Sequence, residues 1–283
     1  MKKLAVHLHL YYLEQLPEIL EYLQSLKEQD YDLFVTMIKH VEEAEKAIKY
    51  FNPKAEIFIL PNQGYDVGPF IEFLHKIDLE KYSYILKIHT KGNVSQNHTW
   101  LNKHRLDNKL WGKILFDSLL KNKERVQNNL DILDHSPHIG ILSSQYCITD
   151  EKRTYDKLLP RINDALNELN LKGMDSLSFV AGTMFYVRAE LLKPLLKYTI
   201  QDFSVTDAKV KEGTFAHVME RLLGAIVLAQ GSLIHGIKHD NYRKQFLIAS
   251  LKHFLFQKKK TEHRLLVKIC KIPIYSKKLG EAE

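Results

Sequence analysis

Apolar residues in the first ninety positions alternate between two spacings. Runs of strand type, apolar with an alternating pattern, are separated by stretches where apolar residues recur every three or four positions, as in amphipathic helices. The predicted strands are 4–12, 31–38, 55–61 and 82–91, and the predicted helices between them are 13–29, 41–51 and 68–77. This order predicts an α/β fold with a Rossmann-type, mostly parallel sheet flanked by helices. Ligands of such sheets bind outside the carboxyl ends of the strands.

The second half of the chain has a less regular pattern. Residues 99–133 are predicted to be mostly helical, and 138–148 to form a strand. A helix is expected over 155–171, with Pro160 breaking or starting it, and another over 213–231, closed by Gly231. Between them, 176–198 reads as a strand, a turn of small residues, a second strand and a helix.

Composition excludes several classes of protein. The chain is 45% hydrophobic and 27% charged, as in soluble globular proteins. Its two cysteines, Cys147 and Cys270, give no disulfide framework or zinc pattern and suit a reducing cytoplasm. His7 and His9 interrupt the apolar start, which argues against a signal peptide, and no apolar run is long enough for a transmembrane helix.

The positive charge is concentrated at one end. The formal net charge is +7, and basic residues far outnumber acidic ones over 243–279, where they alternate with Phe, Leu, Ile and Tyr. Such a segment is typical of contact with an anionic membrane surface, with a solvated basic tail as the alternative. Nucleic-acid binding is disfavoured, because aromatic residues are not interleaved with the charge on a sheet face.

The loop "NQGYDVGPF" lies between two predicted strands. Asn62, Gly64 and Gly68 permit tight turns and let a backbone approach a ligand, and Asp66 can accept hydrogen bonds from a base or ribose. The alternative is a plain strand-to-helix turn with Asp66 as the helix cap. The pattern matches neither the dinucleotide fingerprint nor a P-loop.

The next strand ends in His89, Thr90, Lys91 and Gly92. His89 and Lys91 point the same way because the strand period is two, and Lys87 shares their face. Cationic side chains there can meet the diphosphate of a nucleotide and stabilise the charge that builds on it as it leaves. The alternative is a solvated strand end.

The remaining candidates come from other predicted elements. Gly182 and Thr183 open space beside a strand, followed by Arg188; the alternative is a close crossing of backbones. His217 and Glu220 share a helix face, where a partly buried carboxylate can deprotonate an acceptor hydroxyl. A surface ion pair is the alternative for Glu220. The strand ends add His7, His9 and Thr36; the His7-x-His9 pair lacks the further ligands of a zinc site, so no metal ligands are assigned.

Taken together, these stretches resemble the rhamnan synthesis protein F family of bacterial polysaccharide enzymes. The resemblance is carried by "VHLHLYYLEQLPEIL", "NQGYDVGPF", "YILKIHTKG", "FVAGTMFYVRAELL" and "HVMERLLG", which span residues 6 to about 224. The family is similar in layout to GT-A type glycosyltransferases. The resemblance implies a glycosyltransferase domain over 1–242, with a nucleotide-binding half (1–98) and an acceptor half (99–242), followed by a helical, basic, amphipathic segment over 243–283.

The resemblance also implies a reaction. A sugar, rhamnose or similar, would pass from a dTDP-, UDP- or GDP-linked donor to a lipid-linked saccharide of a cell-wall or capsule polysaccharide, at the inner face of the membrane. Inversion is expected, with Glu220 as base and with Lys91, His89 and Arg188 stabilising the leaving group. His89-x-Lys91 stands where many GT-A enzymes have an acidic metal motif, which puts a bound Mn or Mg ion in doubt. A non-catalytic scaffold of a polysaccharide synthesis complex is the alternative.

The same resemblance distributes the other candidates. His7, His9, Thr36, Asn62, Gly64, Asp66, Gly68 and Thr90 would bind the nucleotide sugar, and Gly182, Thr183, Arg188 and His217 would shape the acceptor or sugar pocket.

Overall fold

The structure is a computed structural model that describes residues 3–92, 99–101, 104–106, 108–206, 213–238, 242–260, 264–270 and 272–278. Contacts divide the chain into two compact units. The first comprises residues 1–91 and 112–239, and the second comprises 92–111 and 240–283. In the described part of the chain, no helix is both long enough and apolar enough to cross a bilayer.

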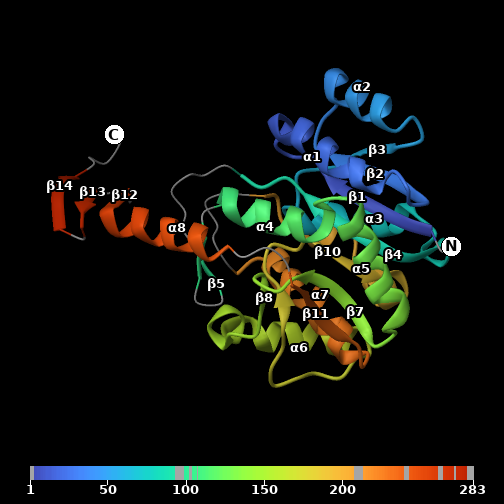
Figure 1. The fold of residues 1–283 in the computed structure, drawn as a ribbon. Helices are drawn as coiled ribbons and strands as arrows, with labels where there is room; N and C mark the ends of the chain where they lie inside the picture. The colour runs from blue at the N-terminus through green and yellow to red at the C-terminus, as the bar shows by residue number, and fades with distance from the viewer. Residues whose placement is uncertain are drawn as a thin grey trace. The chain divides into compact units, whose positions relative to one another are not determined.

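A seven-stranded sheet forms the centre of the first unit (Figure 1). Its order is β11-β7-β10-β4-β1-β2-β3, and all strands are parallel except β10, which is antiparallel to both of its neighbours. The strands are β1 (Lys3–His9), β2 (Tyr31–Met37), β3 (Glu56–Ile59), β4 (Tyr82–His89), β7 (Ile139–Ser144), β10 (Phe185–Arg188) and β11 (Leu233–Ile237). The predicted mostly parallel α/β sheet is therefore confirmed.

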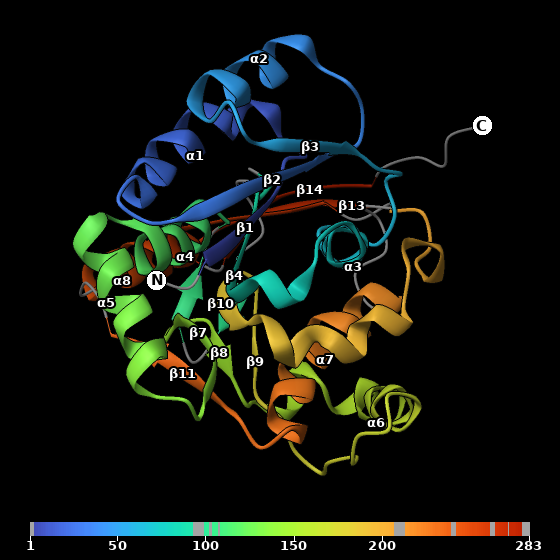
Figure 2. The ribbon, with the colours of Figure 1, turned by 90° about the vertical axis from the view of Figure 1, so that its right-hand side faces the viewer.

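Helices cover both faces of this sheet (Figure 2). α3 and α7 lie on one face, and α1 and α5 lie on the other. The helices of this unit are α1 (Leu16–Leu23), α2 (Glu42–Phe51), α3 (Val67–Lys76), α5 (Lys123–His135), α6 (Leu159–Glu168) and α7 (Phe215–Ala229), and α4 (Asn108–Leu120) enters it from Gly112 onward. The central strands are buried in β1 from Leu4 onward and in β4 at every position except Ser83, so their predicted apolar runs match their position.

The register of the strands sets the position of the site. His9 pairs with Thr36 of β2 on one side and with His89 of β4 on the other, so these three residues lie side by side at the carboxyl edge. Because β10 runs the other way, its first residue, Phe185, lies beside Lys87. The turn that precedes β10 therefore reaches the same edge of the sheet.

Two predicted helical regions differ in the structure. Residues 99–133 begin with a short hairpin, β5 (Thr99–Leu101) and β6 (His104–Leu106), before α4 and α5. Asn122 separates the two helices, because its side chain caps α5 by accepting a hydrogen bond from the Arg125 N–H at 2.8 Å. The prediction of one mostly helical stretch missed both features.

The C-terminal segment was predicted to be helical, and among its described residues only 243–255 form a helix. α8 (Arg243–Leu255) is followed by a three-stranded antiparallel sheet of β12 (Phe256–Lys260), β13 (Arg264–Ile269) and β14 (Ile272–Lys278). The alternation of Lys with Ile, Leu, Val and Tyr from residue 256 onward has the period of a strand, which explains the difference.

Candidate functional site

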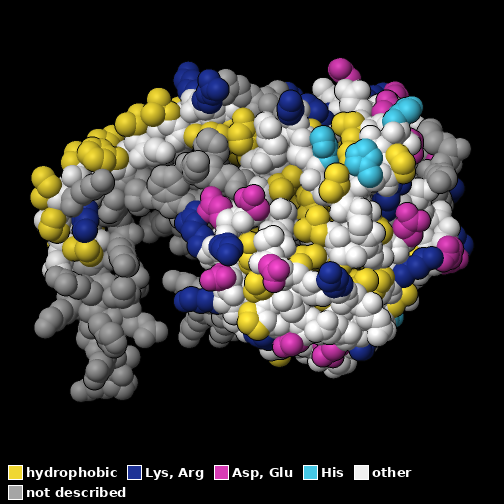
Figure 3. Space-filling view, turned by 90° about the horizontal axis from the view of Figure 1, so that it is seen from below, with side chains coloured by type: hydrophobic (Ala, Val, Ile, Leu, Met, Phe, Trp, Pro, Cys, Tyr) yellow, Lys and Arg dark blue, Asp and Glu magenta, His cyan; other side chains and the backbone are white. Residues whose placement is uncertain are grey.

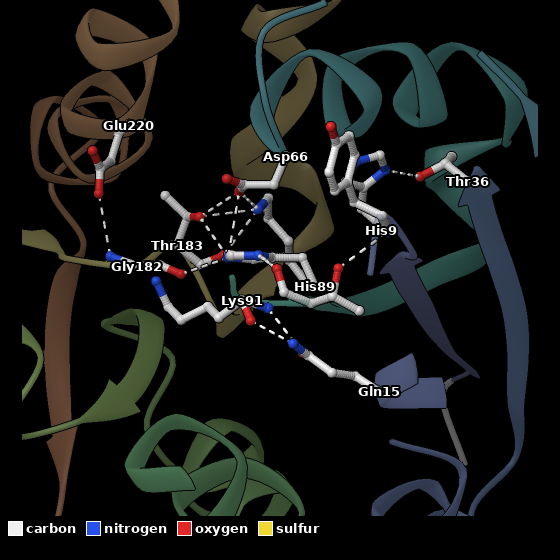
Figure 4. Close-up of polar contacts among 12 residues, drawn as sticks. His9, Gln15, Thr36, Asp66, His89, Lys91, Gly182, Thr183 and Glu220 are labelled. Atoms are coloured by element: carbon white, nitrogen blue, oxygen red, sulfur yellow. Dashed lines mark hydrogen bonds and ion pairs between the residues drawn. The ribbon is translucent and has the colours of Figure 1, made fainter. Parts of the chain in front are cut away.

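Asp66 stands at the centre of a polar cluster at the carboxyl edge of the sheet (Figure 4). It occupies the N-cap position of α3, but its side chain makes no capping hydrogen bond. Instead, its Oδ2 atom accepts hydrogen bonds from Lys87 and Thr183, both at 2.5 Å, and lies 3.6 Å from Nε2 of His89. The alternative reading of Asp66 as a helix cap is therefore wrong.

Lys87 is a buried lysine in the middle of the sheet, with a side chain 1% exposed. Its ammonium group has three hydrogens and three acceptors: Asp66 Oδ2, the Thr183 carbonyl at 3.0 Å and Thr183 Oγ1 at 3.2 Å. Burial lowers the pKa of Lys87, and the Asp66 carboxylate opposes that shift. The complete set of acceptors identifies the charged ammonium as the form that this site holds.

The carboxyl group of Asp66 is held ionised by the same contacts. Burial alone would raise its pKa, but His89 and Lys87 nearby, with hydrogen bonds from Lys87 and Thr183, bring the pKa well below its usual range. All the contacts of Asp66 that the structure describes fall on Oδ2. The second oxygen, Oδ1, belongs to a side chain that is 19% exposed.

His89 and Lys91 follow Lys87 at the carboxyl end of β4. The Nδ1 atom of His89 lies 2.9 Å from the Thr90 carbonyl, and Nε2 lies 2.9 Å from the Gly182 carbonyl. Burial lowers the pKa of His89 to about 4, against the effect of Asp66. Burial also lowers the pKa of Lys91, and Asp66 and Glu220 oppose it. His89 is buried, so it is not part of a solvated strand end.

The turn before β10 joins this cluster to the second half of the chain. Gly182 and Thr183 both have positive φ angles, 89° and 49°. A β-branched residue rarely adopts this conformation, which costs on the order of 1–3 kcal/mol and persists where surrounding contacts impose it. Here the conformation turns the Thr183 carbonyl and hydroxyl toward Lys87 and the Gly182 carbonyl toward His89.

Glu220 reaches the same turn from α7. Its Oε1 atom accepts a hydrogen bond from the Gly182 N–H at 3.2 Å, and Oε2 pairs with Arg221 at 2.6 Å. Arg221 is itself fixed, because it donates to the Thr154 carbonyl through two nitrogens. Since the Glu220 side chain is 23% exposed, its carboxylate is both held in place and open to solvent on one side.

His217 lies one turn before Glu220, near the loop that carries Asp66. Its Nδ1 atom lies 2.7 Å from the Thr214 hydroxyl, and its ring is 5.6 Å from the ring of Tyr65. The structure therefore brings His217 next to that loop.

His7, His9 and Thr36 form a second polar group within the sheet. The Thr36 hydroxyl lies 3.0 Å from both His7 Nε2 and His9 Nδ1. Burial lowers the pKa of His9 to about 3 and that of His7 well below its usual value, so both rings are neutral near pH 7. His7 is fully buried and stacks on Phe73, so it supports the edge from within the core.

Thr90 ties this edge to a neighbouring pocket. Its hydroxyl accepts hydrogen bonds from the N–H groups of Tyr11 and Tyr12, both at 3.0 Å. The pocket has a volume of about 280 Å³ and lies at the carboxyl ends of β1 and β2. Its lining residues are Leu10, Tyr11, Tyr12, Leu13, Glu14, Met37, Ile38 and Lys39.

The glycines of the 62–68 loop are needed for its shape. Gly64 has a φ of 71°, and a Cβ on Gly68 would lie 2.2 Å from the Gln63 carbonyl oxygen. The loop is also fixed from outside, since the Asn62 carbonyl accepts a hydrogen bond from the Thr206 N–H at 2.9 Å. These contacts set the backbone from which Asp66 projects.

Arg188 does not join the cluster. It pairs with Tyr84, near the amino end of β4, and its guanidinium donates to the carbonyls of Leu133, Ser136 and Ile139. The antiparallel direction of β10 separates Arg188 from Thr183, which a sequence spacing of five residues does not reveal.

Lys87 was not itself predicted as a site residue, although a lysine inside an apolar strand is a signal of a functional site. Gln15 was missed without any signal: its side chain accepts a hydrogen bond from the Lys91 N–H at 3.0 Å and donates to the Lys91 carbonyl.

The donor groups at this edge do not fit a divalent cation. Mg²⁺ and Mn²⁺ prefer several carboxylate and carbonyl oxygens. Asp66 Oδ2 is already bonded to an ammonium group, and Lys91 adds a second positive charge nearby. Within the described ranges, no group of three His, Cys, Asp or Glu side chains is placed to hold a metal ion.

The buried neutral histidines predict acid sensitivity. His9 and His89 have folded-state pKa values of about 3 and about 4, below the unfolded value of 6.5, so the unfolded chain takes up protons first as pH falls. The two neutral histidines contribute fully to the free energy of unfolding above about pH 6.5. By about pH 5, protonation of each histidine in the unfolded chain should lower that free energy by roughly 2 kcal/mol. Urea titrations across this range measure the loss, and H9Q should make the slope shallower. A stability that stays constant over the range would contradict this.

Comparison with known sequences assigns the chain to a family. The model of the rhamnan synthesis protein F family matches residues 1–232, which include every residue of the cluster. The chain belongs to the rhamnan synthesis protein F family. The resemblance carried by the sequence motifs is thus confirmed.

Curated relatives of this rhamnan synthesis protein F chain are longer. It is 28% identical over 240 residues to the uncharacterized protein WxcX of Xanthomonas campestris pv. campestris, in strain B100 and in strain ATCC 33913. The matched region covers 80% of this chain and 32% of WxcX, so the chain spans about a third of the length of these relatives.

Solved structures give weak similarities. S. aureus TarS (residues 1–349) has a TM-score of 0.39 at 14% identity, covering 79% of this chain and 56% of that one. The mannosyltransferase PcManGT of Pyrobaculum calidifontis, in complex with GDP-Man and Mn2+, has a TM-score of 0.38 at 13% identity, covering 89% and 70%. TM-scores this low carry no weight for fold or activity in this family member.

Proposed function

We propose that this chain is a glycosyltransferase that moves a sugar, rhamnose or similar, from a nucleotide-sugar donor to an acceptor hydroxyl in polysaccharide synthesis. One observation carries the proposal: residues from β4, the 62–68 loop, the turn before β10 and α7 converge at the carboxyl edge of a mostly parallel sheet. This edge is where such sheets bind ligands. Membership of a family described by rhamnan synthesis supports the same reading.

The donor would lie along this edge with its diphosphate near Lys91, because His89 is neutral near pH 7 and both of its ring nitrogens lie at carbonyl oxygens. A positive side chain placed where charge develops stabilises a leaving diphosphate without needing a metal ion. The pocket beside Tyr11 and Tyr12 suits the nucleotide base, because aromatic rings offer flat apolar surfaces and Thr90 links the pocket to the strand end. The donor class is a dTDP-, UDP- or GDP-sugar.

Glu220 is the proposed base of an inverting reaction. The acceptor oxygen would attack the anomeric carbon as its bond to the phosphate oxygen breaks, and Glu220 would take the acceptor proton. The Gly182 N–H and Arg221 hold the carboxylate in position for this step. Arg188 is left out of the mechanism, since its guanidinium is bonded to carbonyls at the other edge.

Nucleotide binding tests this function directly. Calorimetry with UDP, GDP and dTDP should detect binding of at least one of them, and the affinity should be unchanged when EDTA replaces a divalent cation. This outcome follows from the cationic donor set of the edge. Binding of none of the three would favour a non-catalytic scaffold, and binding that requires Mn²⁺ would overturn the metal-independent part.

We further propose that the acceptor is a lipid-linked saccharide and that the C-terminal segment, residues 243–283, contacts the inner face of the membrane. Figure 3 shows hydrophobic side chains gathered over this segment. On α8 and β14, a set of large apolar side chains is 43–65% exposed: Leu247, Leu251, Phe254, Leu255, Ile272, Ile274 and Tyr275. Exposed apolar side chains in a basic segment favour an anionic bilayer.

Vesicle sedimentation measures this contact. The chain should sediment with vesicles that contain anionic lipid and much less with neutral ones, because both apolar burial and Lys charge contribute. L251D/I274D should abolish sedimentation. L233D is the matched control, since Leu233 is 52% exposed on β11 of the first unit. Equal sedimentation of the double variant and the control would contradict the proposed face.

A further inference from the structure

Within the described residues, all hydrogen bonds and ion pairs of Asp66 fall on one of its two carboxylate oxygens. Lys87 and Thr183 both donate to Oδ2, and His89 lies closest to the same atom. The side chains of Lys87 and Thr183 are buried beneath it, whereas the Asp66 side chain is 19% exposed. A carboxylate anchored through one oxygen has a fixed orientation and leaves the other oxygen as an acceptor.

We infer that Lys87 and Thr183 are positioning residues that direct Oδ1 of Asp66 to accept a hydrogen bond from a hydroxyl of the nucleotide sugar. This inference rests on the proposed function and adds which part of the donor is recognised. An ionised carboxylate is an acceptor only, so it binds hydroxyl groups and repels phosphate oxygens. The diphosphate is then left to Lys91, and the donor has one orientation along the edge.

The hydroxyl has two sources, the ribose and the transferred sugar. A ribose 2′-hydroxyl at Oδ1 predicts that UDP binds more tightly than dUDP and that D66N removes the difference, whereas a 3′-hydroxyl, which dUDP retains, predicts that D66N weakens both nucleotides. A hydroxyl of the transferred sugar predicts that UDP and dUDP bind equally, and that D66N weakens only a nucleotide sugar. A charge-assisted hydrogen bond of this kind corresponds to about a ten- to hundred-fold loss of affinity.

The positioning role has its own readout, the part of the affinity that depends on Asp66. In the wild type, Asp66 stays ionised over about pH 5.5–8, so its contribution to binding should be constant. T183V keeps the shape of the side chain but removes one of the two hydrogen bonds that fix Oδ2, so it should weaken binding when Asp66 is present and have no effect on D66N. T183S keeps the hydroxyl and is the matched control.

The histidines around Asp66 do not change charge in this range. The pKa values of His9 and His89 are about 3 and about 4, and burial lowers the pKa of His7 well below its usual value. The remaining charged groups facing the cluster come from β4 and α7: Lys87, Lys91 and Glu220. K87M should give the same trend as T183V with a larger amplitude.

The experiment is calorimetry of the wild type and of D66N, T183V, T183S and K87M with UDP, dUDP and a UDP-sugar, or with the GDP or dTDP counterparts if those bind. We expect D66N to bind the ligand that carries the recognised hydroxyl about ten- to hundred-fold more weakly and T183V, unlike T183S, to lose part of that affinity. If K87M does not fold, the comparison of T183V with T183S decides. Wild-type affinity of D66N for both the nucleotide and the UDP-sugar, or equal affinities of T183V and T183S, would overturn the inference. Absence of wild-type binding would instead refute the proposed function.

Discussion

E220Q should bind the nucleotide donor almost as tightly as the wild type and lose about a hundred- to ten-thousand-fold in turnover. The amide has the same shape as the carboxylate and can still accept a hydrogen bond from the Gly182 N–H, so the turn before β10 should keep its conformation. What it lacks is the second acceptor oxygen, which pairs with Arg221, and the capacity to take a proton from the acceptor hydroxyl.

Two measurements separate this role from a structural one. Calorimetry reports donor binding, and release of the nucleoside diphosphate in the presence of acceptor reports turnover. E190Q is a suitable control, because Glu190 is exposed at the start of the 3-10 helix Ala189–Lys197 and makes no contact with the cluster. Near-normal turnover of E220Q would remove Glu220 from the role of base.

K87M should be the most destabilising single substitution in the cluster, by about 3–5 kcal/mol of unfolding free energy. Methionine fills the space of the lysine side chain, so little packing is lost. The cost arises because Asp66 Oδ2 loses its counter-ion, and the Thr183 carbonyl loses its hydrogen-bond donor. Removing one partner of a buried pair leaves the other charge uncompensated.

The double variant K87M/D66N tests this explanation. Because it removes both charges, it should recover most of the stability lost in K87M. K76M is the matched control: Lys76 is 42% exposed and pairs with Glu72 at i,i+4, so its loss should cost less than about 1 kcal/mol. Urea unfolding monitored by circular dichroism measures all three. A K87M variant as stable as K76M would show that the buried pair contributes little.

The sheet could be predicted well from the sequence, and its topology only in part. The alternation of strand and helix periods over the first ninety residues predicts a parallel sheet, and the first four strands of the structure form one. β10 shows the limit, since "FVAGTMFYVR" indicates a strand but not its direction. Direction depends on which strands flank it, and those are set by contacts distant in sequence.

The cluster shows the same limit at the level of side chains. A strand period of two was enough to place the side chains of Lys87, His89 and Lys91 on the same face. It could not show that Asp66 turns away from its own helix toward Lys87, because that choice depends on Thr183, which is 117 residues away from Asp66. The hairpin of β5 and β6 was missed because strands of three residues are too short to show a period. The strands β12 to β14 were missed although the sequence from residue 256 onward has the period of a strand.

The reversed strand β10 has a consequence for how the protein is made. Lys87 enters the sheet with β4, yet the carbonyl and hydroxyl of Thr183 that complete its coordination lie 96 residues further on. During translation, the ribosome must therefore add roughly a hundred residues before the nascent sheet can complete the shell around its central ammonium. Contacts of such high sequence separation slow folding, so the first four strands should remain incompletely folded, and open to chaperones, until the turn before β10 has emerged.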